Sequence, residues 1–113
     1  MDVTTSTETA PPDLATMRDV ARQALADASA SDLVPTMRGM IDLLTPQVQA
    51  LIRRAPLGAP SATLAQVALD AARQRFATPA GGFGPDAARR RARLIALSVL
   101  SLCDHFENLG GQA

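Results

Sequence analysis

The 113-residue chain contains no Trp, no Tyr and no Lys, and it has a single Cys and a single His. With only three Phe, the aromatic and β-branched runs that form strands are missing. One Cys cannot form an internal disulfide, which is typical of proteins in a reducing compartment. Eleven Arg balance eleven acidic residues, so the chain has no general electrostatic attraction to nucleic acid or to anionic membranes.

The sequence also lacks recognisable targeting and membrane segments. The N-terminal stretch MDVTTSTETAPPD has acids where a signal peptide needs basic residues, and no apolar segment follows it. The longest nearly unbroken apolar run is LIALSVLSLC at residues 94–103, whereas a membrane span needs about 20 residues. We therefore expect a soluble cytoplasmic protein with no membrane association.

What the chain does contain is Leu, Ala, Val, Ile and Met, which are mostly good helix formers. Apolar positions recur with a helical period in four segments that Pro and Gly separate. We expect residues 1–12 to be a disordered tail, with Asp13 as the cap of the first helix. The first stripe comprises Leu14, Met17, Ala21, Ala24, Leu25 and Ala28.

The second stripe has the clearest period, and it stays in phase across Pro46. An interior proline removes a backbone donor and costs about 3 kcal/mol, so we expect one long helix kinked near Pro46 rather than two short collinear ones. The stripe comprises Met37, Met40, Ile41, Leu44, Val48, Leu51, Ile52 and Ala55.

A third helix follows the turn PLGAPS, and a fourth runs from Pro85 to about Asn108, where Gly110 and Gly111 stop it. The third carries Leu64, Val67, Ala68, Ala71 and Arg75 on one side, with Leu69, Ala72 and Phe76 beside them. The middle of the fourth is apolar almost all round, so this helix should be the most buried. Short connections predict an all-α, single-domain, antiparallel up-down four-helix bundle over residues 13–109, with a flexible C-terminus at 110–113.

The stretch LSLCDHFENL collects the polar residues that are the catalytic candidates: Asp104, His105 and Glu107. Residues two apart on a helix point about 200° from each other, so Cys103 and His105 cannot form a dyad, and Cys103 is expected to pack as a small hydrophobe. Acids are unfavourable at a helix C-terminus, which suggests that Asp104 and Glu107 pair with Arg from a neighbouring helix or a partner. The sequence has no Cys or His residues at zinc-ligand spacing, no P-loop and no nucleophile motif. We therefore expect no metal and no cofactor.

The stretch ARRRARL places Arg89, Arg90, Arg91 and Arg93 near the start of the fourth helix. On a helix they spread over several sides, which is typical of a solvated, acid-paired helix start. The alternative is a dock for an anion or an acidic partner, because Arg forms bidentate pairs with carboxylate and phosphate.

Three helical segments, DLATMRDVARQAL, IDLLTPQVQALI and LSVLSLCDHFENL, carry a likeness that spans roughly residues 13–109. Together they resemble a family of small, uncharacterised actinobacterial proteins that are sometimes labelled natural product biosynthesis proteins. The resemblance implies a Streptomyces-type host and a link to specialised metabolism or its regulation. It implies no reaction and no catalytic residue.

Three functional hypotheses follow. We favour a non-enzymatic accessory or regulatory protein that acts by protein–protein interaction, as a homo-oligomer or with a pathway partner, because no catalytic constellation is found. The first alternative is a small-molecule-binding protein or cofactor-free enzyme with a Met/Leu-lined cavity near His105. The second is a nucleic-acid-associated regulator that uses the four clustered arginines, although the neutral net charge disfavours nucleic acid as a partner.

Overall fold

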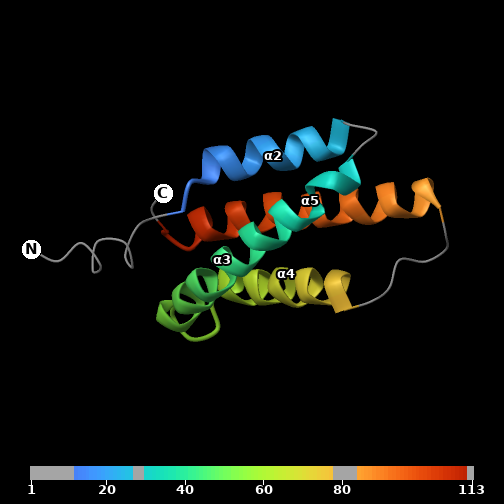
Figure 1. Cartoon of the computed structure of the whole chain (residues 1–113). Helices are drawn as coiled ribbons and strands as arrows, with labels where there is room; N and C mark the ends of the chain where they lie inside the picture. The colour runs from blue at the N-terminus through green and yellow to red at the C-terminus, as the bar shows by residue number, and fades with distance from the viewer. Residues whose placement is uncertain (1–11, 27–29, 78–83, 112–113) are drawn as a thin grey trace, which may run out of the picture.

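The computed structural model describes residues 12–26, 30–77 and 84–111. Over these ranges the chain forms helices and no strand: α2 (Leu14–Ala26), the 3-10 helix η1 (Ala30–Leu33), α3 (Val34–Arg54), α4 (Pro60–Ala77) and α5 (Pro85–Asn108). Successive α-helices run in alternating directions, as Figure 1 shows. The predicted all-α four-helix bundle is confirmed. None of the described helices is long and apolar enough to cross a membrane.

α5 is the central helix of the bundle, as its nearly continuous apolar surface predicts. It packs against α2, α3 and α4, whereas the described parts of α2 and α4 lie on opposite sides of α5 and do not contact each other. α3 crosses α5 obliquely (Figure 1). The helices α2, α5 and α4 therefore form a layer, and α3 covers one of its two faces.

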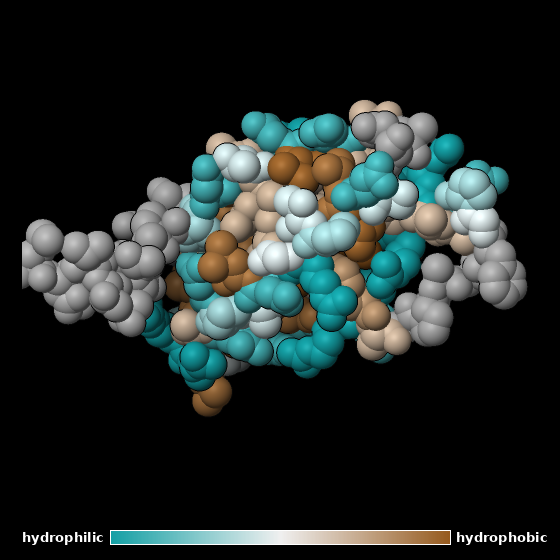
Figure 2. Space-filling model, viewed as in Figure 1, coloured by the Kyte–Doolittle hydropathy of each residue, from teal (hydrophilic) through white to brown (hydrophobic). Residues whose placement is uncertain are grey.

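Small residues let these helices approach closely. Leu and Met fill the remaining space, and Met37, Leu44 and Leu102 are each fully buried. Figure 2 shows the face that carries α3, where apolar side chains lie in small groups between hydrophilic ones. The alanines that are 0–1% exposed in the α-helices are Ala21, Ala24, Ala65, Ala72, Ala92 and Ala96.

The first helix begins and the last helix ends with the capping that the sequence predicts, and both caps lie at the same end of the bundle (Figure 1). Asp13 accepts a hydrogen bond from the Thr16 backbone N–H at 3.1 Å, which satisfies a free donor in the first turn of α2. At the end of α5, Gly110 has a φ of 89°, and the Gly111 N–H donates to the Phe106 carbonyl at 2.8 Å. This is the Schellman arrangement, in which glycine takes the left-handed position that other residues avoid.

α3 runs through Pro46 without interruption, so the prediction of one long helix is confirmed, while the kink stays a prediction. Proline has no N–H, so the carbonyl of Asp42 receives no helical bond from Pro46. The Thr45 hydroxyl donates to the Ile41 carbonyl at 2.7 Å beside this gap. The continuous apolar face, buried against α5, keeps the helix together despite the proline.

On α4 the buried residues are Ala65, Leu69 and Ala72, so the helix packs through the side that carries Leu69 and Ala72. Leu64 and Val67, on the other predicted apolar side, are each 60% exposed.

Residues 1–11 of the predicted tail, Ala28 of the first stripe and residues 112–113 of the predicted flexible end lie outside the described residues. Pro12 is described and is buried, and Gly110 and Gly111 form the cap of α5.

Candidate functional site

An arginine from α2 balances one of the two negative charges at the acidic end of α5. The Nη2 atom of Arg18 lies 2.7 Å from Oδ1 of Asp104 and 2.6 Å from Oε1 of Glu107. The Arg18 side chain is only 18% exposed, whereas the two carboxylates face solvent. The predicted pairing of these acids with a neighbouring Arg is therefore confirmed, with Arg18 as the partner.

This pairing determines the chemistry available at the end of α5. The hydrogen bond from Arg18 lowers the pKa of Glu107 and raises that of Arg18, so both groups are charged at neutral pH. An ionised carboxylate only accepts hydrogen bonds, so Glu107 is unsuited to general acid catalysis. Burial raises the pKa of the Cys103 thiol, and the nearby Arg18 charge only partly opposes this effect. Cys103 is fully buried, as predicted from its place on the apolar face.

The four arginines near the start of α5 do not form one patch. Arg89, Arg90 and Arg93 are exposed, whereas Arg91 is half-buried, with Cζ 5.7 Å from the centre of the Phe76 ring on α4. One of the four cations is therefore used in packing α5 against α4. His105, the third catalytic candidate, is half-buried in the last turn of α5.

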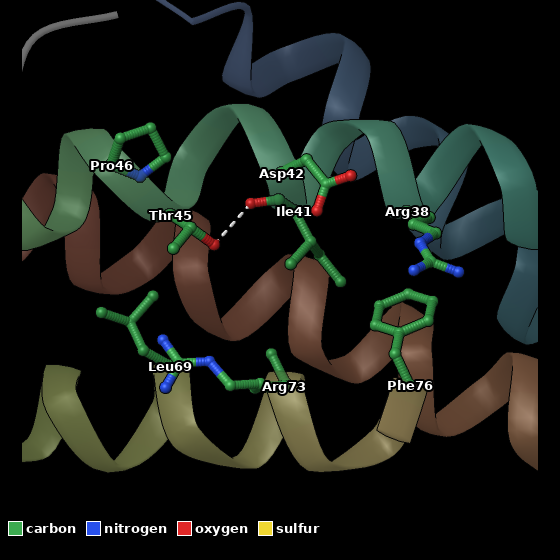
Figure 3. Close-up of a pocket in the computed structure, with 9 residues that line it drawn as sticks. Arg38, Ile41, Asp42, Thr45, Pro46, Leu69, Arg73 and Phe76 are labelled. Carbon is green, nitrogen blue, oxygen red and sulfur yellow. Dashed lines mark hydrogen bonds between the residues drawn. The ribbon is translucent and has the colours of Figure 1, made fainter. Parts of the chain in front are cut away.

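A cleft of about 280 Å³ lies between α3 and α4. Figure 3 shows its aromatic end, where the guanidinium of Arg38 lies over the ring of Phe76. Arg38 Cζ is 5.1 Å from the ring centre, so with Arg91 the ring contacts two cations. The lining residues are Arg38, Ile41, Asp42, Thr45 and Pro46 from α3, and Leu69, Ala72, Arg73 and Phe76 from α4.

The residues that line this cleft are better suited to binding an anionic ligand than to catalysing a reaction. Two arginines and one aspartate line it, and its walls are otherwise largely apolar. The Thr45 hydroxyl is bound to the Ile41 carbonyl, which leaves it poorly placed to act as a nucleophile. The expected cavity near His105 was to be lined by Met and Leu, whereas neither Met nor His105 lines this cleft.

Another candidate for a functional surface is the face of α5 that no described helix covers. We call it the outer stripe; its members are spaced three or four apart, so they share one side of the helix. Leu94 and Leu97 lie at its middle and are 45% and 46% exposed. The outer stripe comprises Arg90, Leu94, Leu97, Ser101, Asp104 and Asn108.

A contact from α4 lies at the edge of the outer stripe. Arg75 donates from Nη1 to the Leu94 carbonyl at 2.8 Å and to Ser98 Oγ at 2.5 Å. Leu64 and Ala71 occupy the same side of α4 as Arg75, because they precede it by 11 and four residues. The helix beside the outer stripe, α4, therefore also carries an exposed leucine, Leu64.

Sequence reasoning missed both the cleft and the outer stripe. The cleft residues come from two helices and share no sequence motif, so no local signal points to them. The outer stripe had a signal: Arg90, Leu97 and Asp104 follow one another at intervals of seven residues. This spacing is hard to recognise in the sequence, because the middle of α5 carries apolar residues on nearly every side.

No group of three potential metal ligands gathers within the described ranges. The model of DUF6415, a family of unknown function, matches residues 15–111. No curated protein and no solved structure matches the chain.

Proposed function

Because this chain belongs to DUF6415, a family of unknown function, its role has to be argued from its own surface. We propose that it is a non-enzymatic accessory or regulatory protein that acts by binding another protein through a helix face. The observation that carries this proposal is the outer stripe, which leaves Leu94 and Leu97 nearly half exposed on the central helix of the bundle.

The physical argument concerns where the exposed apolar side chains lie. Single exposed leucines are common on soluble proteins, but a group of them that spans neighbouring helices is typical of interaction sites. Leu94 and Leu97 lie on α5, and Leu64 and Val67, each 60% exposed, lie on the neighbouring helix α4. Covering apolar surface contributes about 25 cal/mol per Å², so these side chains favour a partner.

The polar residues support a binding role over catalysis. Two of the three acid–base candidates, Asp104 and Glu107, are held by Arg18. The same ion pairs fix the end of α5 against α2, which gives the outer stripe a rigid support. A preformed surface loses little conformational entropy when a partner binds.

We place this role in the cytoplasm of an actinobacterium, in specialised metabolism or its regulation. The cellular setting is supported by the single Cys, which cannot form an internal disulfide. The metabolic setting rests on the resemblance of three helical segments to proteins with that label.

The proposal is tested by affinity capture from the host lysate with tagged wild type, Leu97→Asp and Leu43→Asp. Leu43 is the matched control, because it is 50% exposed on α3 and lies outside the outer stripe. We expect wild type and Leu43→Asp to retain the same protein at near-stoichiometric amounts, and Leu97→Asp to lose it. Capture that is equal for all three proteins, or absent with wild type, contradicts the proposal.

A second candidate function is supported by the α3–α4 cleft, namely binding of a small aromatic carboxylate. Arg38 stacks on Phe76, and Arg73 also lines the cleft, so cation and ring are held together. Benzoate is a suitable probe in NMR titrations, with Arg38→Gln as the test variant and the exposed Arg53→Gln as the control. Shifts confined to the cleft and lost only in Arg38→Gln support this function; unchanged spectra at millimolar benzoate contradict it.

A further inference from the structure

We infer that the partner of the outer stripe is a second copy of this chain, bound by antiparallel, two-fold symmetric pairing of the two α5 helices around Leu97. This inference rests on the proposed function, because it identifies the partner of the same surface.

The order of charges along the outer stripe carries the argument. Arg90 lies seven residues before Leu97, and Asp104 lies seven residues after it. Seven residues are nearly two full turns and about 10.5 Å along the axis, so Arg90, Leu97 and Asp104 face almost the same direction. The stripe is thus basic at one end, apolar in the middle and acidic at the other end.

Such a surface is complementary to itself when it is reversed. In a two-fold antiparallel pair, a residue before Leu97 in one copy is level with the residue equally far after Leu97 in the other. Arg90 is then opposite Asp104 of the partner subunit, and the symmetry repeats this ion pair. Parallel pairing would instead place like charges together, which costs energy. The charge order therefore favours the antiparallel arrangement.

Both charged groups are available for these contacts. Asp104 binds Arg18 through Oδ1, but its side chain is 66% exposed, and a carboxylate accepts several hydrogen bonds. Arg18 holds this carboxylate in place on the surface of α5. Arg90 is exposed, and no carboxylate of a described residue lies within ion-pair distance of it.

Apolar contacts supply the centre of the proposed interface. Leu97 meets Leu97 of the partner subunit at the axis, and Leu94 lies one turn away. A stable dimer usually buries about 800 Å² on each partner, which is more than one pair of helices provides. The neighbouring helix α4 carries two further exposed apolar side chains, Leu64 and Val67, and we expect them to supply part of the remaining area. We expect a dissociation constant in the micromolar range, about that of a small, reversible interface.

Sedimentation equilibrium of the full-length chain tests the inference. Wild type and Leu43→Asp are expected to change from monomer to dimer as the concentration rises through the micromolar range. Leu97→Asp is expected to weaken dimerisation by at least about tenfold, because it places a charge at the centre of the interface. Circular dichroism of each variant shows whether the bundle is retained.

A charge-reversal pair tests the antiparallel register. Arg90→Glu alone and Asp104→Arg alone each place like charges opposite one another in a homodimer, so each is expected to be largely monomeric. Mixed together, the two variants restore opposite charges at both ion pairs. We therefore expect heterodimers in the mixture at concentrations where neither variant dimerises alone.

The outcomes separate this inference from the proposed function. A wild-type chain that stays monomeric up to about 500 µM overturns the second-copy inference. The same holds if Leu97→Asp dimerises as well as wild type does. If such a chain still captures a different protein that Leu97→Asp loses, the proposed function stands while the inference fails. A dimer that Leu97→Asp weakens, together with no rescue in the charge-reversed mixture, overturns the antiparallel register.

Discussion

Arg18 and Asp104 are 86 positions apart in the sequence, and Nη2 of Arg18 donates to Oδ1 of Asp104 at 2.7 Å. This contact joins α2 to the last turns of α5, together with the bond from Arg18 to Glu107. Acids at the C-terminus of a helix oppose its dipole, and the guanidinium compensates for this effect. The ion pair therefore stabilises an end of α5 that its own sequence would weaken.

Replacing Arg18 with Met is expected to lower the melting temperature most at neutral pH. Arg18 lowers the pKa of Glu107 in the folded state. The stabilisation from this ion pair is therefore fully present above the pKa of Glu107 in the unfolded chain, near 4.5. It is lost as the pH falls through the lower folded-state value. The difference in melting temperature between wild type and Arg18→Met should therefore shrink as the pH falls from 7 to about 3.

The control for this series is Arg22→Met. Arg22 lies on the same helix, but its side chain is 64% exposed, and among the described residues it pairs only with Asp19, at 3.6 Å. An exposed pair of this kind contributes little, so Arg22→Met should barely change the melting temperature at any pH. Equal losses for the two variants, or an Arg18→Met loss that does not depend on pH, would contradict the role of the Arg18 ion pairs.

Replacing Arg75 with Met is expected to lower the free energy of unfolding by about 1–2 kcal/mol. The substitution keeps an apolar stem but removes the donor to the Leu94 carbonyl and to Ser98, which is 3% exposed. Urea denaturation measures the change. Arg73→Met is the comparison, because Arg73 is exposed and its only ion pair among the described residues is a long one, 3.9 Å to Asp70.

The Cys103 thiol is expected to be inert in the folded protein. It is fully buried, and burial raises its pKa, so little thiolate forms at pH 8 and reagents cannot reach it. We expect iodoacetamide labelling, followed by mass spectrometry, to be at least about a hundredfold slower than in denaturant. Fast labelling under native conditions would show that α5 opens locally around this residue.

Replacing Pro46 with Ala is expected to stabilise the protein by about 1–3 kcal/mol, because it restores a backbone donor to the Asp42 carbonyl. Pro35→Ala is the control, since Pro35 lies in the first turn of α3, where its missing N–H has no helical acceptor. Thermal or urea unfolding of both variants provides the comparison. A loss of stability in Pro46→Ala would show that the proline is needed for packing at the α3–α4 cleft.

Local chemistry is why much of the fold could be predicted from the sequence. Periodic apolar residues, the Asp13 cap and the glycines after α5 act within one helix, so their effects are visible along the chain. The helix through Pro46 was predictable because its apolar stripe keeps its phase. The burial of Cys103 was predictable because its neighbours on the helix already define an apolar face.

The contacts between helices were decided by the tertiary structure. The sequence suggested that the acids on α5 need an arginine, but it could not select Arg18 among eleven, because the choice depends on which surface of α2 meets α5. The pairing of Arg38 and Phe76 likewise depends on how α3 crosses the bundle. Apolar periodicity determines that a helix has a buried face, whereas only packing decides which apolar residues, such as Leu97, stay outside.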